Sequence, residues 1–512
     1  MPVRNSDLHN DGDINSGDGG SDSAGGGVDG GNQTGGDHNA FGAFDSNASE
    51  GDHPESKIPE KDGSGRKVIK TAAAAASVHP RRRMSQNFFL HIHAPKVHPF
   101  SLQPGYTLGL GIILGFLFLI MIFTGVLLML HYTPSVSEAY NSVKEIVFTV
   151  PGGRLIRNMH RLASNAMVLV VFLHMLRVFY TGSYLGGRHL NWLFGVVMFV
   201  MVLLMSFSGY LLPWDQLSYW AVTIGSNIAA SARELTDLLG ITGVFDIGGF
   251  LQRVLIGGET VGQTALTRFF MLHVVFLPVA MLVFIGLHFW RIRKDGGLSR
   301  PDNARVKKME KIYAWPALMW VELAILIGVV AVVLLLSFFI ESPLLEAANP
   351  THPDNPAKSP WYFLGIQELV SYSAFSGGLL IPVLFLYFLI SIPYKDKEEE
   401  FTGIWFSGQE GLKVTLWSAI AAFAIVVIQV FVFVKWGWLR DWFPGISQWF
   451  VLLFNPATIS TGGFVVIAEL VKRRMGSTRM AALAMFTMAI VALIIFTVIG
   501  IWFRGANWEF GV

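Results

Sequence analysis

Four histidines bound two apolar stretches of the sequence at nearly equal spacing. His160 and His174 bound HRLASNAMVLVVFLH, and His273 and His288 bound HVVFLPVAMLVFIGLH. A titratable side chain inside a membrane helix is costly and by default marks a functional site. With a rise of about 1.5 Å per residue, the two imidazoles of each helix lie roughly 21 Å apart. Each helix therefore presents one histidine near each face of a membrane.

The two helices are expected to run parallel, which puts His160 level with His273 and His174 level with His288. Two neutral imidazoles that face each other can hold one haem iron in a six-coordinate site without an open position. Such a site suits electron transfer and not oxygen binding. We therefore expect these four side chains to hold the irons of two haems.

Glycines recur in two other apolar stretches at a matching interval. Gly111 and Gly125 lie 14 residues apart, as do Gly195 and Gly209. Glycine weakens a helix, but it allows a flat macrocycle to approach the backbone closely. These glycines are expected to form notches beside the two haems.

Two alternatives use the same histidines differently. They could bond to polar groups of neighbouring helices, or they could relay protons through a transporter. A relay predicts polar residues along its path, whereas the interval from His160 to His174 is apolar except for Ser164 and Asn165 near one end. An assembly subunit has no reason to keep both histidine pairs and both glycine pairs. The other histidines, such as His189, are expected at the interface.

Arginines flank the histidines on both sides. Guanidinium is the natural partner of a carboxylate, and haem carries two propionates; ordinary snorkelling to the interface is the alternative. Arg157, Arg161 and Arg268 lie near the pair His160 and His273, and Arg291 and Arg293 lie near the pair His174 and His288.

The composition indicates an all-α polytopic membrane protein. Of 512 residues, 52% are hydrophobic and only 14% are charged, against roughly 25% charged in soluble domains. Several apolar runs reach the roughly 20 residues that span a bilayer. We expect eight or nine spans, at about 108–131, 161–180, 192–212, 270–290, 315–340, 378–394, 414–434, 447–470 and 482–503. The run at 447–470 contains NPATISTGG and is the weakest.

The absence of cysteine excludes disulfides, thiolate metal sites, iron–sulfur clusters and thioether-linked haem on this chain. Any haem must therefore be held without a covalent link, and histidine is the obvious ligand.

Five segments are expected along the chain. An acidic, glycine-rich tail (1–66) is expected to be disordered, and a basic entry segment follows (67–105). Next come a four-helix di-haem domain (106–300), a C-terminal helical domain (301–475) and an extra helix (476–512). The loop at 291–311 has eight Lys or Arg against three acids, and such basic loops lie on the cytoplasmic side of a membrane, the negative side. Because four expected spans separate the N-terminus from this loop, the N-terminus is expected on the same side. The partners expected are lipid and protein, not nucleic acid.

Over about 90–310 the sequence resembles cytochrome b, the haem-bearing subunit of quinol–cytochrome c or plastocyanin reductases. The strings that carry the resemblance are RLIRNMHRLASNAMVLVVFLHMLRVFYTGSY, GYLLPWDQLSYWAVT and GQTALTRFFMLHVVFLPVAMLVFIGLHFWRIRKDG. The interval of 15 between His273 and His288 is similar to the chloroplast-type and related bacterial branch. Residues 315–470 resemble that family's C-terminal part, here fused into one chain.

The resemblance implies a function in respiratory electron transport. Quinol is oxidised at the positive side beside a Rieske iron–sulfur protein, one electron goes to that protein and then to a c-type cytochrome, and the other crosses two b haems to a quinone at the negative side. The pair His160 and His273 would hold the low-potential haem, and His174 and His288 the high-potential haem. The resemblance also implies a homodimeric complex in a bacterial inner membrane.

Two departures from the family pattern matter. The chloroplast-type branch attaches a third haem through a cysteine near the first span, where this chain has Thr107, so no covalent haem is expected. The quinol motif Pro-Glu-Trp-Tyr is replaced by SPWY, with Pro360 in place of the glutamate. Trp361 and Tyr362 match the motif, and variants of this kind favour menaquinol as the donor. Glu368, or more weakly Asp215, is a candidate proton acceptor in place of the missing glutamate; an exposed surface carboxylate is the alternative for Glu368.

Arg293, Lys294 and Asp295 follow His288 and form a candidate site for quinone reduction, although any positive-inside loop has such a composition. The rival function in the same broad class is a di-haem anchor of a dehydrogenase or hydrogenase. Such an anchor needs two haems but no positive-side quinol motif.

Overall fold

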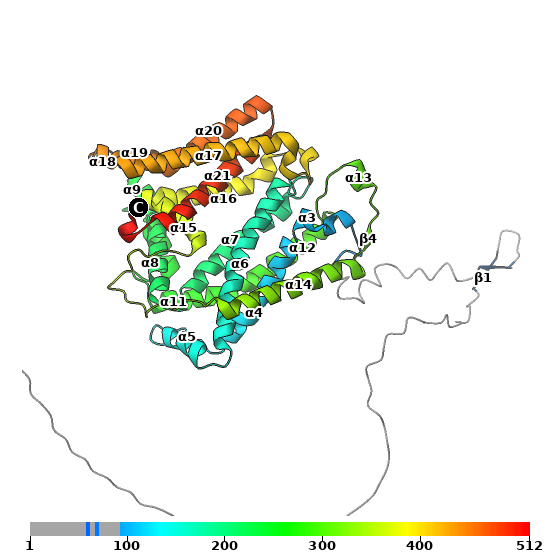
Figure 1. Cartoon of the computed structure of the whole chain (residues 1–512), viewed down its shortest axis with the longest axis horizontal. Coiled ribbons are helices and arrows are strands. Elements are labelled where there is room, and N and C mark those ends of the chain that lie inside the picture. Colours follow the sequence, from blue (N-terminus) through cyan, green and yellow to red (C-terminus); the bar gives the residue numbers. More distant parts are fainter. Residues whose placement is uncertain (1–57, 62–66, 71–92, 512) are drawn as a thin grey trace, which may run out of the picture. The chain divides into compact units, whose positions relative to one another are not determined.

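The computed structural model describes residues 58–61, 67–70 and 93–511 (Figure 1). Among these residues, eight helical segments are long and apolar enough to cross a membrane. They are Leu110–Met129, Gly153–Tyr180, His189–Tyr210, Gln263–Lys294, Ala314–Phe339, Ser376–Lys395, Trp405–Trp442 and Thr478–Phe503. The expected all-α membrane fold is confirmed.

Four spans form the N-terminal bundle. These are α4 (Leu110–Met129), α6 (Gly153–Tyr180), α7 (His189–Tyr210) and a composite of α11 (Gln263–Met271), the π-helical turn η3 (Leu272–Phe276) and α12 (Leu277–Lys294). Helix α4 packs against α6, and α7 packs against α12. An apolar core that includes Leu117, Met167 and Met281 fills the middle of the bundle.

Short helices cover one face of this bundle. They are α5 (Ala139–Phe148), α8 (Gln216–Ala230), α9 (Arg233–Leu238) and α10 (Ile247–Ile256). The carboxylate of Asp215 accepts the Ser218 N–H and caps α8, and Asp246 caps α10 in the same way. We call this side of the molecule the opposite face.

The other side, which we call the basic face, gathers the connections 181–188, 295–313 and 396–407. The Ser183 and Ser299 hydroxyls lie 2.5 Å apart, and the Gly403 N–H donates to the Thr181 carbonyl. Residues 472–477 join them, because the Ser477 hydroxyl donates to Glu398. The two basic stretches at 291–311 and 472–479 therefore lie on one face, as the charge pattern predicts.

The C-terminal part packs beside the bundle. Its helices are α14 (Ala314–Phe339), α15 (Trp361–Tyr372), η4 (Ser376–Leu380), α16 (Ile381–Lys395), η5 (Glu399–Phe401), η6 (Trp405–Ser407), α17 (Gly408–Trp436), α18 (Leu439–Trp442), α19 (Gln448–Leu453), α20 (Pro456–Met475), α21 (Thr478–Val498), η7 (Ile499–Phe503) and η8 (Ala506–Trp508).

Helix α20 runs antiparallel to α17 and α21, although it is not among the eight segments that are long and apolar enough to cross a membrane. Helices α17 and α21 are parallel, because Tyr372 contacts Phe433 near the end of α17 and Phe496 near the end of α21, while Arg479 at the start of α21 donates to Ser407, just before α17. A chain that leaves α17 at the opposite face must therefore return to the basic face before α21 begins. Helix α20 makes this return (Figure 1).

Two buried arginines fix the ends of α21. At the basic face, Arg479 is fully buried and donates to Ser407, the Tyr184 hydroxyl and the Phe179 carbonyl, with Asp396 at 3.6 Å. At the opposite face, Arg504 pairs with Glu368. Breaking such a buried pair by removing one partner typically costs about 3–5 kcal/mol, so these contacts join the last helix firmly to the rest.

The remaining described elements are short. Strands β1 (Ile58–Lys61) and β2 (Lys67–Lys70) form an antiparallel hairpin, and β3 (Lys96–Val97) pairs with β4 (Ile312–Tyr313). The helical turns η2 (Pro99–Leu102) and α3 (Pro104–Thr107) precede α4, and α13 (Ala304–Lys307) lies in the basic-face loop. The prediction of a disordered tail falls, apart from β1, on residues outside the described ranges.

Candidate functional site

The histidine pair near the opposite face brings together α6 and η3. The ring centroids of His160 and His273 lie 6.2 Å apart. The Nδ1 of His273 lies 3.0 Å from the Met205 carbonyl, and the Nδ1 of His160 lies 2.9 Å from the Thr124 hydroxyl. Because Thr124 donates its own proton to the Ile120 carbonyl, it accepts from His160. Both rings thus carry a proton on Nδ1 and keep the Nε2 lone pair for a ligand.

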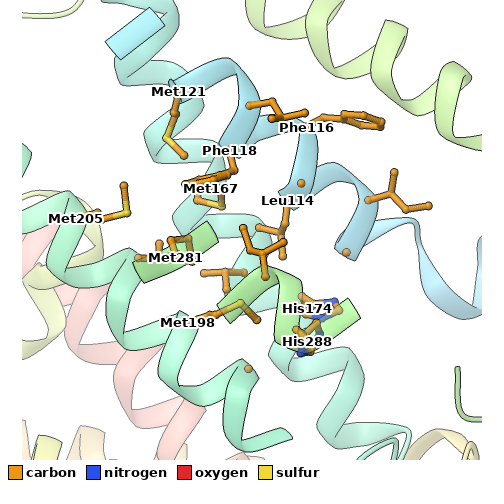
Figure 2. Close-up of a pocket in the computed structure, with 18 of the residues that line it drawn as sticks. Leu114, Phe116, Phe118, Met121, Met167, His174, Met198, Met205, Met281 and His288 are labelled. Carbon is orange, nitrogen blue, oxygen red and sulfur yellow. The ribbon is translucent and has the colours of Figure 1, made fainter. Parts of the chain in front are cut away.

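The second pair lies toward the basic face. Figure 2 shows His174 of α6 and His288 of α12 side by side, with Met198 at their height and Met167 and Met281 higher in the view. The Nδ1 of His174 is buried and has no hydrogen-bond partner among the described residues. The structure thus brings together the histidines that the sequence analysis paired.

The unequal intervals of 14 and 15 residues are reconciled by the π-helical turn η3, which contains His273. An α-helix turns about 100° per residue, so one additional residue would swing His288 away from His174. A π turn absorbs one residue in a wider loop of backbone. Both pairs can therefore face each other despite the difference in spacing.

Each predicted glycine faces a different histidine. A Cβ atom added at Gly209 would lie well inside contact distance of the His273 ring, which makes this the closest of the four approaches. The other added Cβ atoms would lie 3.2 Å from His160 at Gly125, 3.5 Å from His174 at Gly111, and 4.0 Å from His288 at Gly195. Alanine at the tightest positions would push the rings toward the cavity.

A cavity of about 1950 Å³ runs past all four histidines and all four glycines. Its middle is lined by apolar side chains of the four bundle helices, including Leu114, Phe118 and Met121 (Figure 2). Polar and charged side chains line its two ends. This shape suits large flat apolar groups with charged edges.

The arginines near the opposite-face pair divide into two groups. Arg157 and Arg161 line the cavity, and Arg157 also donates to the carbonyls of Ser342 and Pro343. Arg268 is a correction to the sequence-based expectation, because its guanidinium donates to the carbonyls of Arg253 and Val254 at the surface. It is not among the residues that line the cavity.

At the basic-face end, Arg293 and Asp295 line the cavity, and Asp295 pairs with Arg291 at 2.9 Å. Lys294 is a second correction. Its ammonium lies 5.0 Å from the centre of the Trp290 ring and does not line the cavity.

The sequence analysis missed two cations at this end, Arg177 and Arg188. Both line the cavity, and each has a buried guanidinium nitrogen without a hydrogen-bond partner among the described residues. Arg177 lies three residues after His174, so its spacing could have indicated it. Arg188 lies in the loop before α7, and only the tertiary fold brings it in.

The SPWY segment begins α15 beside the opposite-face end of the cavity. Pro360 and Tyr362 line the cavity, whereas the indole of Trp361 donates to Asn165. Burial raises the pKa of Tyr362, although hydrogen bonding to Ser206 and the nearby charge of Arg161 oppose the shift. The phenol therefore stays protonated at neutral pH and can donate a hydrogen bond.

Glu368 differs from both sequence-based expectations. It is fully buried, not exposed at the surface, and it does not line the cavity. Its carboxylate accepts from Arg504, Tyr372 and Trp508. Asp215 does line the cavity, but its oxygens accept the N–H groups of Ser218 and Leu345.

The residues present fit haem. Two metal–imidazole bonds of about 2 Å and two ring radii of roughly 1.1 Å put ring centroids about 6 Å apart, which agrees with the 6.2 Å between His160 and His273. The open Nε2 atoms of His160 and His273, the glycine notches and the cations at the cavity ends are what a bis-histidine haem with two carboxylates requires.

Comparison with known proteins gives three findings. Residues 96–296 match the family model described as Cytochrome b/b6/petB. The chain is 44% identical over 179 residues to cytochrome b6 of Prochlorococcus marinus strain MIT 9211, and to that of strain MIT 9515, which is 35% of this chain and 77% of each relative. A solved structure titled "Hyperthermophilic respiratory Complex III" matches the fold with a TM-score of 0.55 and 23% identity, over 83% of this chain and 95% of that one.

Proposed function

The chain belongs to the cytochrome b/b6 family, and from this we propose that it is the membrane di-haem electron-transfer subunit of a quinol–cytochrome c oxidoreductase. The observation that carries the proposal is the two facing histidine pairs at two depths of one cavity. His160 and His273 would hold one non-covalent b haem, and His174 and His288 the other. When bound, these haems supply one-electron chemistry near both membrane faces.

The cations at the ends of the cavity would hold the haem carboxylates. Arg157 and Arg161 serve the opposite-face site, and Arg177 and Arg188 serve the basic-face site. The unpartnered guanidinium nitrogens of Arg177 and Arg188 support this assignment, because a buried cationic donor without a partner is costly.

Quinol oxidation is assigned to the opposite face, where Trp361 and Tyr362 begin α15. The protonated Tyr362 hydroxyl can donate to a quinol or quinone oxygen from the cavity wall. Glu368, held by Arg504, is better suited to fixing α15 than to accepting a proton. Quinone reduction is assigned to the basic-face end, beside Arg293 and Asp295.

The complete complex requires partners. We propose a Rieske iron–sulfur protein and a c-type cytochrome as electron acceptors at the opposite face, menaquinol as the donor, and a homodimeric assembly. The location that fits is a bacterial inner membrane with the basic face toward the cytoplasm, so that quinol oxidation and quinone reduction together contribute to the proton-motive force. The basic loops on one face support this orientation.

The first experiment counts haem in the purified chain by extraction and by reduced-minus-oxidised absorbance, followed by a redox titration. We expect two b-type haems with separated midpoint potentials in the natural chain. His160→Leu and His174→Leu should each lose one haem, and the potential that disappears should differ between them. His189→Leu, at an exposed histidine outside the cavity, is the matched control and should keep both. A single haem in the natural chain would contradict the proposal.

A further inference from the structure

Glu322 is the only charged residue in the sequence of α14, Ala314–Phe339. It lies eight residues, about 12 Å, from the start of this membrane helix. An ionisable side chain at such a depth is costly and usually serves a function. Neither the haem sites nor the quinol segment uses it.

His93, in the segment before β3, contacts this carboxylate. Its Nε2 lies 2.9 Å from Glu322 Oε1, and the two side chains remain 25% and 21% exposed. Both residues line the large cavity. A carboxylate and an imidazole in hydrogen-bonding contact can pass a proton between them at neutral pH, and here they can also pass it to a molecule in the cavity.

Packing puts the pair close to the basic-face histidines. A Cβ atom added at Gly109 would lie 2.9 Å from Ile325, one turn beyond Glu322 on α14. A Cβ atom added at Gly111, two residues along, would lie 3.5 Å from His174. Along the helix axes, Glu322 therefore lies about 7.5 Å, roughly one and a half helical turns, from the level of His174 toward the basic face.

Cations surround this end of the cavity. Lys96, Arg300 and Lys311 line it together with His98, and the Lys96 ammonium lies 4.9 Å from the centre of the Tyr313 ring. Positive charge from these segments would stabilise a negatively charged quinone intermediate. The same residues come from the basic-face connections, from which water can supply protons.

We propose that Glu322 and His93 form the proton-exchanging pair of a quinone site at the basic-face end of the cavity. This inference rests on the proposed function. Reduction of one quinone to quinol consumes two electrons and two protons. The electrons come from quinol oxidised at the opposite face, and Glu322 with His93 delivers protons to the two quinone oxygens and is reprotonated from the basic-face water.

The test uses the full haem-loaded chain in lipid nanodiscs with 2-methyl-1,4-naphthoquinone as the probe. In Glu322→Gln, the rate at which the probe reoxidises the chemically reduced basic-face haem should fall at least tenfold at pH 8, since a general acid contributes about 10²- to 10⁴-fold. His93→Gln should also slow this step, and Glu322→Asp should restore much of it. Glu310→Gln, at an exposed residue of the same face outside the cavity, should behave as the natural chain does.

A second readout does not depend on turnover. The infrared difference spectrum between the reduced and oxidised chain, with probe bound, should contain a carboxylic-acid band that Glu322→Gln removes and Glu310→Gln keeps. If Glu322→Gln leaves the rate and the spectrum unchanged while two haems are bound, the pair only anchors the entry segment to α14. In that case the proton-exchange proposal fails and the proposed function stands. A natural chain without two haems would overturn the proposed function and this inference together.

Discussion

At the scale of single residues, the atoms around each histidine decide what it can bind. The Met205 carbonyl and the Thr124 hydroxyl occupy the Nδ1 atoms of His273 and His160. Such contacts fix the tautomer and the ring orientation, and they make the imidazole a better ligand. Residues of the neighbouring helices α4 and α7, and not of the ligand helices, therefore leave the Nε2 atoms free to bind a ligand.

Gly209→Ala should damage the opposite-face haem site specifically. Alanine favours a helix over glycine by about 0.5–1 kcal/mol, so the change by itself should not unfold α7. Its methyl group, however, would collide with the His273 ring. We expect at least half of the opposite-face haem to be lost, measured by haem extraction and difference spectra.

The matched control for this change is Gly286→Ala on α12. No atom lies within 4 Å of a Cβ added at Gly286, and the residue does not line the cavity. It should keep both haems. Full haem content in Gly209→Ala would show that the ring can move aside and that close approach is not required there.

The histidines and glycines were predictable because their spacing alone encodes two shared depths. The contacts of Arg268 could not be predicted, because proximity in sequence to His273 does not say in which direction a side chain points from its helix. Its guanidinium donates to two backbone carbonyls of α10. Glu368 was ambiguous for a related reason. Its partner Arg504 lies 136 residues away, and no local pattern reveals such a pair.

At the scale of helices, the π turn η3 is the feature that sequence spacing could indicate but not locate. An interval of 15 in one helix against 14 in its partner requires an irregularity somewhere between His273 and His288. The structure puts it at Leu272–Phe276, which ends two residues before Pro278. Proline lacks an N–H group and disfavours regular helix immediately upstream, which is consistent with this position.

Deletion of Val275 should be tolerated by both haem sites. It removes the additional residue within η3, so a regular α-helix can then carry His273 and His288 at an interval of 14. Insertion of one alanine after Val283 should instead rotate His288 by about 100° away from His174. Haem counting should give two haems for the deletion and one for the insertion, and loss of a haem in the deletion would contradict the role given to η3.

At the scale of the whole molecule, buried polar contacts join the C-terminal helices to the N-terminal bundle. Arg479 of α21 donates to the Phe179 carbonyl at the end of α6 and to the Tyr184 hydroxyl in the loop after α6. Hydropathy identified the apolar spans, but it cannot find such contacts. It also ranks α20 low, although the hydroxyls of Thr458 and Thr461 donate to backbone carbonyls, which reduces the cost of these groups in a membrane.

The return of α20 from the opposite face to the basic face predicts the sidedness of the C-terminal part. The chain has no cysteine, so single introduced cysteines can be labelled without background by a membrane-impermeant maleimide on sealed vesicles of either orientation. Arg440→Cys and Gly511→Cys, both exposed, should react from one side, because α17 and α21 end at the same face. Glu310→Cys and Arg474→Cys, also exposed, should react from the other side. Labelling of positions 440 and 474 from the same side would mean that α20 does not cross, and α17 and α21 could then not be parallel.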